Sequence, residues 1–314
     1  GNYLLMMFYT TIAGWLLLYF FKVAAGEFRG LDAAGVENAF GAMQGNVGIQ
    51  LLFMGIVVVL GMLICSRGLK NGVEKVNKAM MLCLLALLVV LAVRALTLPG
   101  AMEGVKFYLV PNFHNLMYDA DGSFRLFRAI YDAMGQAFFS LSINGAGMLI
   151  YGSYMKKGEN ILRHAGMTAV LDTLAALLAG FAILPAVFAF GIDPTSGPQL
   201  MFVTLPQIFQ QMPGGRIFAL LFFVSVFFAG ITSLMNMLEA CGEALTSTFR
   251  LSRTVSTLLV GAAAFLPGLF LESLAGMGGW MDLITIYVSP FGALLVAVCI
   301  YLSLIHISEP TRPY

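Results

Sequence analysis

Long apolar segments, separated by short polar loops, make up most of the chain. A membrane-spanning helix needs about 20 mainly apolar residues. Because eight segments reach about this length, the pattern predicts an all-α polytopic membrane protein with eight transmembrane helices. The segments are 3–25, 46–66, 79–98, 128–154, 165–191, 216–246, 254–272 and 282–302.

The polar loops carry charge unevenly, and this predicts an orientation. Loops 66–78, 155–164 and 247–254 hold most of the Lys and Arg residues, and each joins an alternate pair of apolar segments. By the positive-inside rule these three loops are cytoplasmic, whereas loops 99–127 and 192–215 lie outside. We therefore expect a multi-pass protein of the inner (plasma) membrane whose first segment runs outward from the cytoplasm.

The fourth apolar segment contains a run of poor helix formers, "SINGAG", from Ser142 to Gly147. An irregular backbone at membrane depth survives only where protein buries it or where it lines a watery cavity. The run therefore predicts a broken helix whose backbone groups face a ligand, an ion or water.

Composition supports the membrane assignment and limits the function. The chain is 60% hydrophobic and 11% charged, against about 25% charged in a typical soluble domain. A net charge of +1 gives no basic surface for nucleic acid. No HExxH, GxSxG or CxxC motif is present, so we expect no enzyme. The four cysteines are interpreted as small hydrophobic residues of the spans.

Asp172 is the most informative single residue, because it lies well inside an apolar segment. A carboxylate at the centre of a spanning helix costs roughly 2.5–3.5 kcal/mol on the insertion scale and by default marks a functional site. The alternative is an ion pair with Lys or Arg of a neighbouring span, for which the sequence offers no evident candidate at that depth.

The two ends of the chain differ from the rest. The first residue is Gly1 rather than Met, and we expect that the natural N-terminus is missing. Residues 303–314, "SLIHISEPTRPY", form a polar, proline-containing tail that resembles a translated sequencing adapter. We therefore treat residues 1–302 as a transmembrane domain fragment and leave His306 out of every functional argument.

Several phrases together resemble one family. They include "FYTTIAGW" (8–15), "RGLKNGVEKVNKAMM" (67–81), "DAMGQAFFSLS" (132–142) and "FFAGITSLMNMLEA" (227–240). The chain resembles the neurotransmitter:sodium symporters, above all their bacterial amino-acid branch. The resemblance implies a five-plus-five inverted repeat with broken helices, here incomplete. Helices three to ten are present, while helices one and two are absent, so we expect the fragment itself to be inactive.

The resemblance also implies a substrate site. Tyr9 matches the tyrosine whose hydroxyl holds the substrate carboxylate, and Phe139 matches the aromatic lid above the substrate. From position alone, each would be interpreted as a packed core residue. The full set of implied substrate-binding residues is Leu5, Tyr9, Phe139, Ser140, Ser142, Gly145, Leu234 and Met237.

Two sodium ions and two gates follow from the same resemblance, and no organic cofactor is implied. Ser140 and Asp172 match the first sodium site. Asp282 matches the outer gate and Tyr154 the cytoplasmic gate, although an interfacial charge explains Asp282 equally well. Close helix packing is the alternative for the second sodium site, whose residues are Ala229, Thr232 and Ser233.

Departures from the family pattern refine the expectation. Gly145 stands where some relatives have a bulky pocket wall, which favours a large hydrophobic or aromatic amino acid as substrate. Ala176 carries no charge, so Asp172 would replace chloride near the first sodium ion. Ser247 replaces an aspartate that many relatives have in the cytoplasmic gate, which puts the usual form of that gate in doubt.

The leading hypothesis is a sodium-coupled amino-acid symporter that works by alternating access. At about −100 mV, each positive charge carried inward gains about 2.3 kcal/mol from the membrane potential. The expected partners are an amino-acid substrate and the lipid bilayer, and the sequence leaves the oligomeric state open. The alternative is a non-transporting membrane scaffold or sensor of the same fold.

Overall fold

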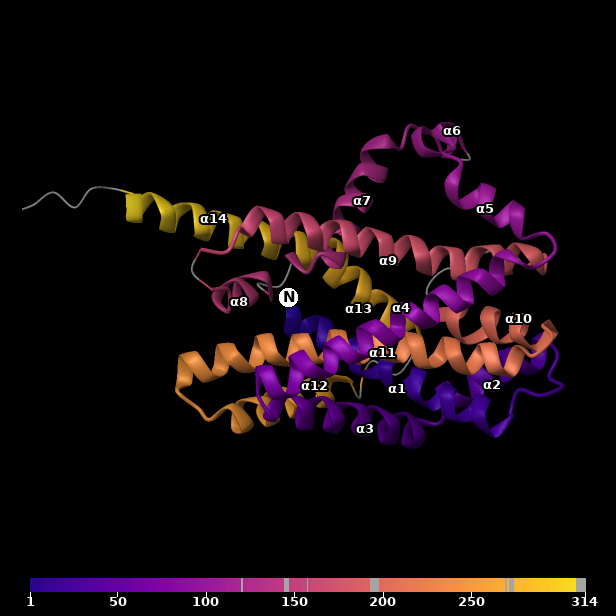
Figure 1. The fold of residues 1–314 in the computed structure, drawn as a ribbon, viewed down its shortest axis with the longest axis horizontal. Helices are drawn as coiled ribbons and strands as arrows, with labels where there is room; N and C mark the ends of the chain where they lie inside the picture. The colour runs from indigo at the N-terminus through magenta and orange to yellow at the C-terminus, as the bar shows by residue number, and fades with distance from the viewer. Residues whose placement is uncertain are drawn as a thin grey trace, which may run out of the picture.

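The computed structural model describes residues 1–119, 121–143, 147–156, 158–192, 198–268, 270 and 274–308. Apart from one isolated β-bridge, its regular elements are helices, and the long ones lie side by side in a bundle (Figure 1). The helices are α1 (Asn2–Ala25), α2 (Ala33–Gly45), α3 (Val47–Ser66), α4 (Lys75–Leu96), α5 (Ala101–Leu109), α6 (Phe113–Met117), α7 (Leu126–Ser140), α8 (Gly147–Ser153), α9 (Ile161–Ala189), α10 (Leu205–Gln211), α11 (Gly215–Phe249), α12 (Arg253–Gly268), α13 (Leu274–Asp282) and α14 (Ser289–Ser308), with π-helical segments η1 (Leu69–Glu74), η3 (Leu200–Thr204) and η4 (Leu283–Val288).

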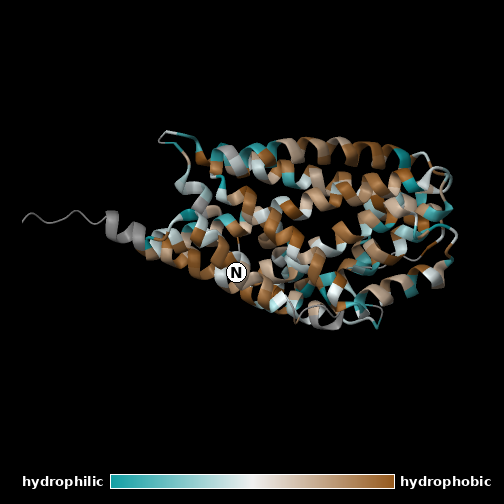
Figure 2. Ribbon diagram, turned by 90° about the horizontal axis from the view of Figure 1, so that it is seen from below, coloured by the Kyte–Doolittle hydropathy of each residue, from teal (hydrophilic) through white to brown (hydrophobic). Residues whose placement is uncertain are grey.

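Six helices of the described part are long and apolar enough to cross a membrane. In Figure 2 hydrophobic residues fill the middle of the long helices and hydrophilic residues gather toward their ends. The chain is therefore a multi-pass membrane protein, as its apolar pattern predicts. The six spans are Asn2–Ala25, Val47–Ser66, Gly72–Leu96, Ile161–Ala189, Gly215–Phe249 and Met277–Leu302.

Among the described residues, neither of the other two predicted segments, 128–154 and 254–272, forms a single long helix. The first is divided between α7, with 15 residues, and α8, with seven. Between them Ser142 has a φ of 54°, in the left-handed region that non-glycine residues rarely adopt. The predicted interruption of this helix is therefore present. The second segment forms α12, which has only 16 described residues.

Helix ends follow local chemistry. Gly26 ends α1 with a φ of 83°, and its N–H donates to carbonyl groups of the last turn. Asparagine begins two long helices: the Asn46 side chain accepts from the Ile49 N–H at 3.1 Å, and the Asn160 side chain accepts from the Arg163 N–H at 3.1 Å. Such caps satisfy amides that have no partner inside the helix.

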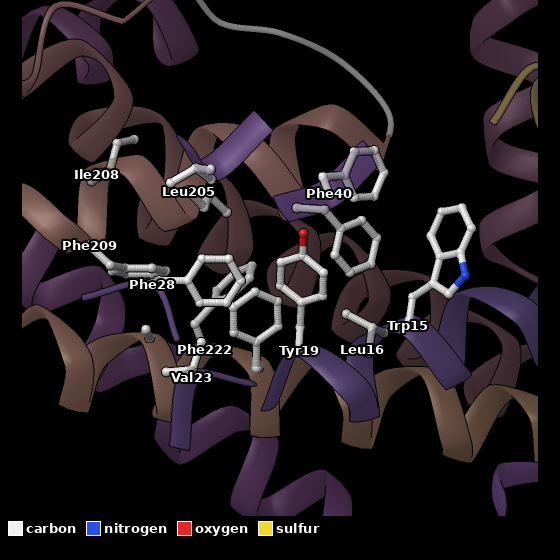
Figure 3. Packing of buried hydrophobic residues seen from close by; sticks show 14 of the residues in the cluster. Trp15, Leu16, Tyr19, Val23, Phe28, Phe40, Leu205, Ile208, Phe209 and Phe222 are labelled. Carbon is white, nitrogen blue, oxygen red and sulfur yellow. The ribbon is translucent and has the colours of Figure 1, made fainter. Parts of the chain in front are cut away.

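An aromatic cluster fixes α1 to the elements around it (Figure 3). Tyr19 and Trp15 of α1 are almost fully buried, and their rings lie 4.9 and 5.6 Å from that of Phe202 in η3. Phe40 of α2 and Phe223 of α11 complete the cluster. Since these rings come from four elements, they hold connecting segments as well as spanning helices around α1.

Small residues let α1 and α3 approach closely. A Cβ atom added to Gly14 of α1 would lie 2.8 Å from the backbone nitrogen of Met54 in α3, too close without movement of a helix. By contrast, a Cβ added to Gly41 of α2 would meet nothing within 4 Å.

We expect Gly14→Ala to lower the free energy of unfolding by about 1–3 kcal/mol, because a backbone rather than a flexible side chain must move. The matched change Gly41→Ala should be neutral or stabilise the protein by up to about 1 kcal/mol, since alanine has a higher helix propensity than glycine. Unfolding of both variants in detergent micelles measures the difference, and equal effects would contradict the close contact.

Candidate functional site

A cavity of about 270 Å³ lies at the interruption between α7 and α8. Helices α1, α7, α8, α9 and α11 all contribute to its wall, so it lies between the broken helix and the long helices of the bundle. Its lining mixes hydroxyl, carboxylate and amide groups with apolar side chains. The lining residues are Asn2, Leu5, Tyr9, Phe139, Ser140, Ser142, Tyr151, Asp172, Ser233, Asn236 and Met237.

Ser140 and Asp172 meet in this cavity. The Ser140 hydroxyl, in the last residue of α7, donates a hydrogen bond of 2.6 Å to Asp172 Oδ2 of α9. The two residues are 32 positions apart, so only the packing of α9 beside the break brings them together. A carboxylate and a hydroxyl oxygen at this distance are hard donors of the kind that sodium prefers.

Aromatic side chains form another part of the wall. The rings of Tyr9 and Phe139 lie 6.4 Å apart, centroid to centroid, with a tilt of 30°. Leu5 and Met237 line the same cavity, and Leu5 lies one helical turn from Tyr9. Together they add apolar side chains to a cavity that also has polar groups, which suits a molecule with a charged end and a hydrophobic side chain.

The three residues predicted for the second sodium site lie on one turn of α11. The Thr232 hydroxyl lies 2.8 Å from the Phe228 carbonyl and 3.0 Å from the Ala229 carbonyl. The Thr232 oxygen keeps lone pairs that can accept a further contact. Ser233 lines the cavity. This turn thus provides the hydroxyl oxygens of Thr232 and Ser233 beside the Ala229 carbonyl, which already accepts a hydrogen bond from Thr232.

Other predicted site residues lie away from the cavity or outside the described residues. Leu234 is fully buried in a core cluster with Met6 and Ile231, because one residue along a helix turns the side chain by about 100° from Ser233. Asp282 is exposed at the end of α13. Gly145 lies outside the described residues.

Tyr154, which directly follows α8, belongs to a polar cluster around Glu239 of α11. Its hydroxyl donates to Glu239 Oε1 at 3.2 Å, and Arg253 forms an ion pair with the same carboxylate through Oε2. Arg253 also donates to the Cys65 carbonyl at 2.9 Å. The cluster therefore ties together the ends of α3 and α8 and the start of α12. The three basic loops consequently lie at one end of the bundle, as a shared cytoplasmic location requires.

Sequence reasoning missed Asn236 and Glu239, although both carried a signal. Glu239 lies inside an apolar segment, so the argument made for Asp172 applies to it equally. Asn236 follows Ser233 by three residues, which places both on one face of the helix. Tyr151 lines the cavity, but an isolated tyrosine in a span gives no comparable signal.

An all-helical membrane protein in which a broken helix lines a polar cavity has the architecture of a secondary transporter. The sodium:neurotransmitter symporter family model matches residues 25–312, and the chain belongs to this family. This confirms the resemblance and assigns the chain to transporters rather than enzymes.

Relatives and a solved structure give the extent of the similarity. The sodium-dependent transporter YhdH of Bacillus subtilis is 41% identical over 76% of this chain and 51% of its own length. A sodium-dependent transporter of Haemophilus influenzae is 32% identical over 85% and 58%. The chain thus spans about half the length of these curated relatives. The crystal structure of MhsT in complex with L-phenylalanine has a TM-score of 0.83 and 31% identity, covering 95% of this chain and 68% of that one.

Proposed function

We propose that the protein is a sodium-coupled amino-acid symporter that works by alternating access. The observation that carries this proposal is the Ser140–Asp172 pair beside Tyr9 in one cavity. The Asp172 carboxylate attracts a cation, the cation attracts a substrate carboxylate, and the tyrosine hydroxyl donates a hydrogen bond to that carboxylate. Sodium and substrate would therefore bind cooperatively, as symport requires.

We propose a large hydrophobic or aromatic amino acid as the substrate. The apolar part of the cavity, with Leu5, Phe139 and Met237, supports a hydrophobic side chain. The similarity to MhsT, whose structure holds L-phenylalanine, points in the same direction.

The test is uptake of radiolabelled L-phenylalanine into liposomes that contain the product of the complete reading frame. We expect accumulation that requires an inward sodium gradient and is competed more strongly by aromatic amino acids than by glycine. Replacing sodium by choline is the control. Binding of the amino acid without sodium-dependent accumulation would instead indicate a scaffold or sensor.

We also expect sodium-driven uptake to be independent of chloride. Asp172 supplies a negative charge beside the proposed sodium ion, whereas Ala176, one turn along α9, carries none. Replacing chloride by gluconate at constant sodium should leave the initial rate unchanged. If that replacement abolished uptake, Asp172 would not do the electrostatic work of an anion.

A further inference from the structure

Polar side chains form a stripe along one face of α11. Thr232, Asn236 and Glu239 follow one another at positions i, i+4 and i+7, which share a helix face, and Ser233 borders this face three residues before Asn236. Ser233 and Asn236 line the cavity, while Glu239 belongs to the cluster with Arg253. The stripe therefore runs from the cavity toward the end of the bundle that holds the basic loops.

Asn236 lies at the middle of this stripe and is bound from another helix. Asn77 Nδ2, in the first turn of α4, donates to Asn236 Oδ1 at 3.1 Å. Asn77 itself belongs to the basic loop 66–78, which contains η1 and the first turn of α4. The asparagine pair thus connects the cavity to the loop that is predicted to be cytoplasmic.

The side-chain oxygens of Asn77 and Asn236 have acceptor lone pairs without a partner among the described residues. Asn77 Oδ1 is buried and has no hydrogen-bond partner among the described residues. Leaving a buried acceptor unpaired is unfavourable, because the group loses its hydrogen bonds to water. Asn236 Oδ1 accepts one hydrogen bond, and an amide oxygen has a second lone pair. Each of the two amide oxygens therefore retains a lone pair that can coordinate a hard cation or accept a hydrogen bond from water.

We propose that Asn77 and Asn236 form a transit site for sodium between the hydroxyls of Thr232 and Ser233 and the cytoplasm. This inference rests on the proposed function. Neutral amide oxygens bind the ion without a permanent charge, and an ion that must leave needs such weak, successive sites. Glu239, the next polar residue of the stripe, is already engaged by Arg253 and Tyr154.

A purely structural hydrogen bond is the alternative, because polar side chains also join membrane helices. Thr246 provides the matched control. Its hydroxyl, on the same helix α11, donates to Ser256 Oγ of α12 at 2.9 Å, away from the cavity lining. Loss of a structural bond lowers stability and leaves the dependence on sodium unchanged.

The experiment measures sodium-driven uptake in liposomes by the product of the complete reading frame and its Asn77→Leu, Asn236→Leu and Thr246→Val variants. We expect both asparagine variants to raise the half-saturating sodium concentration by about tenfold, the lower range for loss of a supporting metal contact. Thr246→Val should retain the wild-type value. An unchanged sodium dependence in the asparagine variants would overturn the inference.

Asn77→Asp is a control for misfolding of the leucine variants, because aspartate has nearly the same size as asparagine and keeps a side-chain oxygen. A carboxylate there should retain the ion, so the half-saturating sodium concentration should fall and the maximal rate should fall with it. A wild-type rate and sodium dependence in this variant would also contradict the transit site. If uptake by the wild-type protein did not require sodium, the proposed function would be wrong. If wild-type uptake required sodium and the asparagine variants had the same sodium dependence, only this inference would be wrong.

Discussion

Replacing Asp172 by alanine should abolish sodium-coupled uptake at physiological sodium. The change removes the carboxylate that accepts the Ser140 hydrogen bond in the cavity. Loss of a group that only supports a metal ligand already lowers metal affinity about 10–100-fold, so loss of the carboxylate ligand itself should raise the half-saturating sodium concentration about 100-fold or more. Uptake measured over a wide range of sodium concentrations at constant ionic strength gives this value.

Two further variants separate the charge from the fold. Asp172→Asn keeps one oxygen without the charge, and its loss of sodium affinity should be smaller than that of the alanine variant. Thr173→Val changes the next residue of α9, whose hydroxyl donates to the Ala169 carbonyl of its own helix at 2.8 Å. It should leave sodium dependence unchanged. A sodium response of Asp172→Ala that equals wild type would remove Asp172 from the site.

Replacing Arg253 by alanine should destabilise the protein by about 3 kcal/mol. The change leaves the Glu239 carboxylate, with 4% of its side chain exposed, without its cation. We place the effect at the low end of the range for buried pairs because 31% of the Arg253 side chain is exposed. The midpoint of unfolding in detergent measures the loss.

The double variant Glu239→Leu/Arg253→Ala gives the decisive comparison. Removing both charges leaves no buried ion, so the double variant should be more stable than Arg253→Ala alone. The coupling free energy from the complete cycle of variants should be favourable. Additive losses would mean that the two side chains do not interact in solution.

The sequence predicted the interruption of the fourth segment and the importance of Asp172 by energetic arguments that need no structure. Unpaired backbone and buried charge are so unfavourable in a membrane that their position alone indicates a site. Glu239 is a second charge inside an apolar segment and was predictable on the same ground. The eight apolar segments exceed the six long spanning helices of the described residues because segment 128–154 is divided into α7 and α8 and segment 254–272 forms the shorter α12.

Contacts between helices could not be predicted from apolar periodicity. Asn77 and Asn236 are 159 residues apart, and Ser140 and Asp172 are 32 apart. Buried segments that are apolar on all sides give no preferred face, so the sequence does not specify which neighbours meet. The place of Leu234 in the core rather than in the cavity is another consequence of helix rotation.

The sequence by itself determined a helical membrane protein, its long spans, its broken helix and its family. These properties follow from local hydrophobicity, from the need to pair every backbone group in lipid and from recurring sequence phrases. Only the tertiary structure decided that Asp172 meets Ser140, that Tyr154 and Arg253 share Glu239, and that Asn77 reaches Asn236. Each of these contacts joins side chains from different elements, and their geometry depends on how the helices rotate and pack against one another.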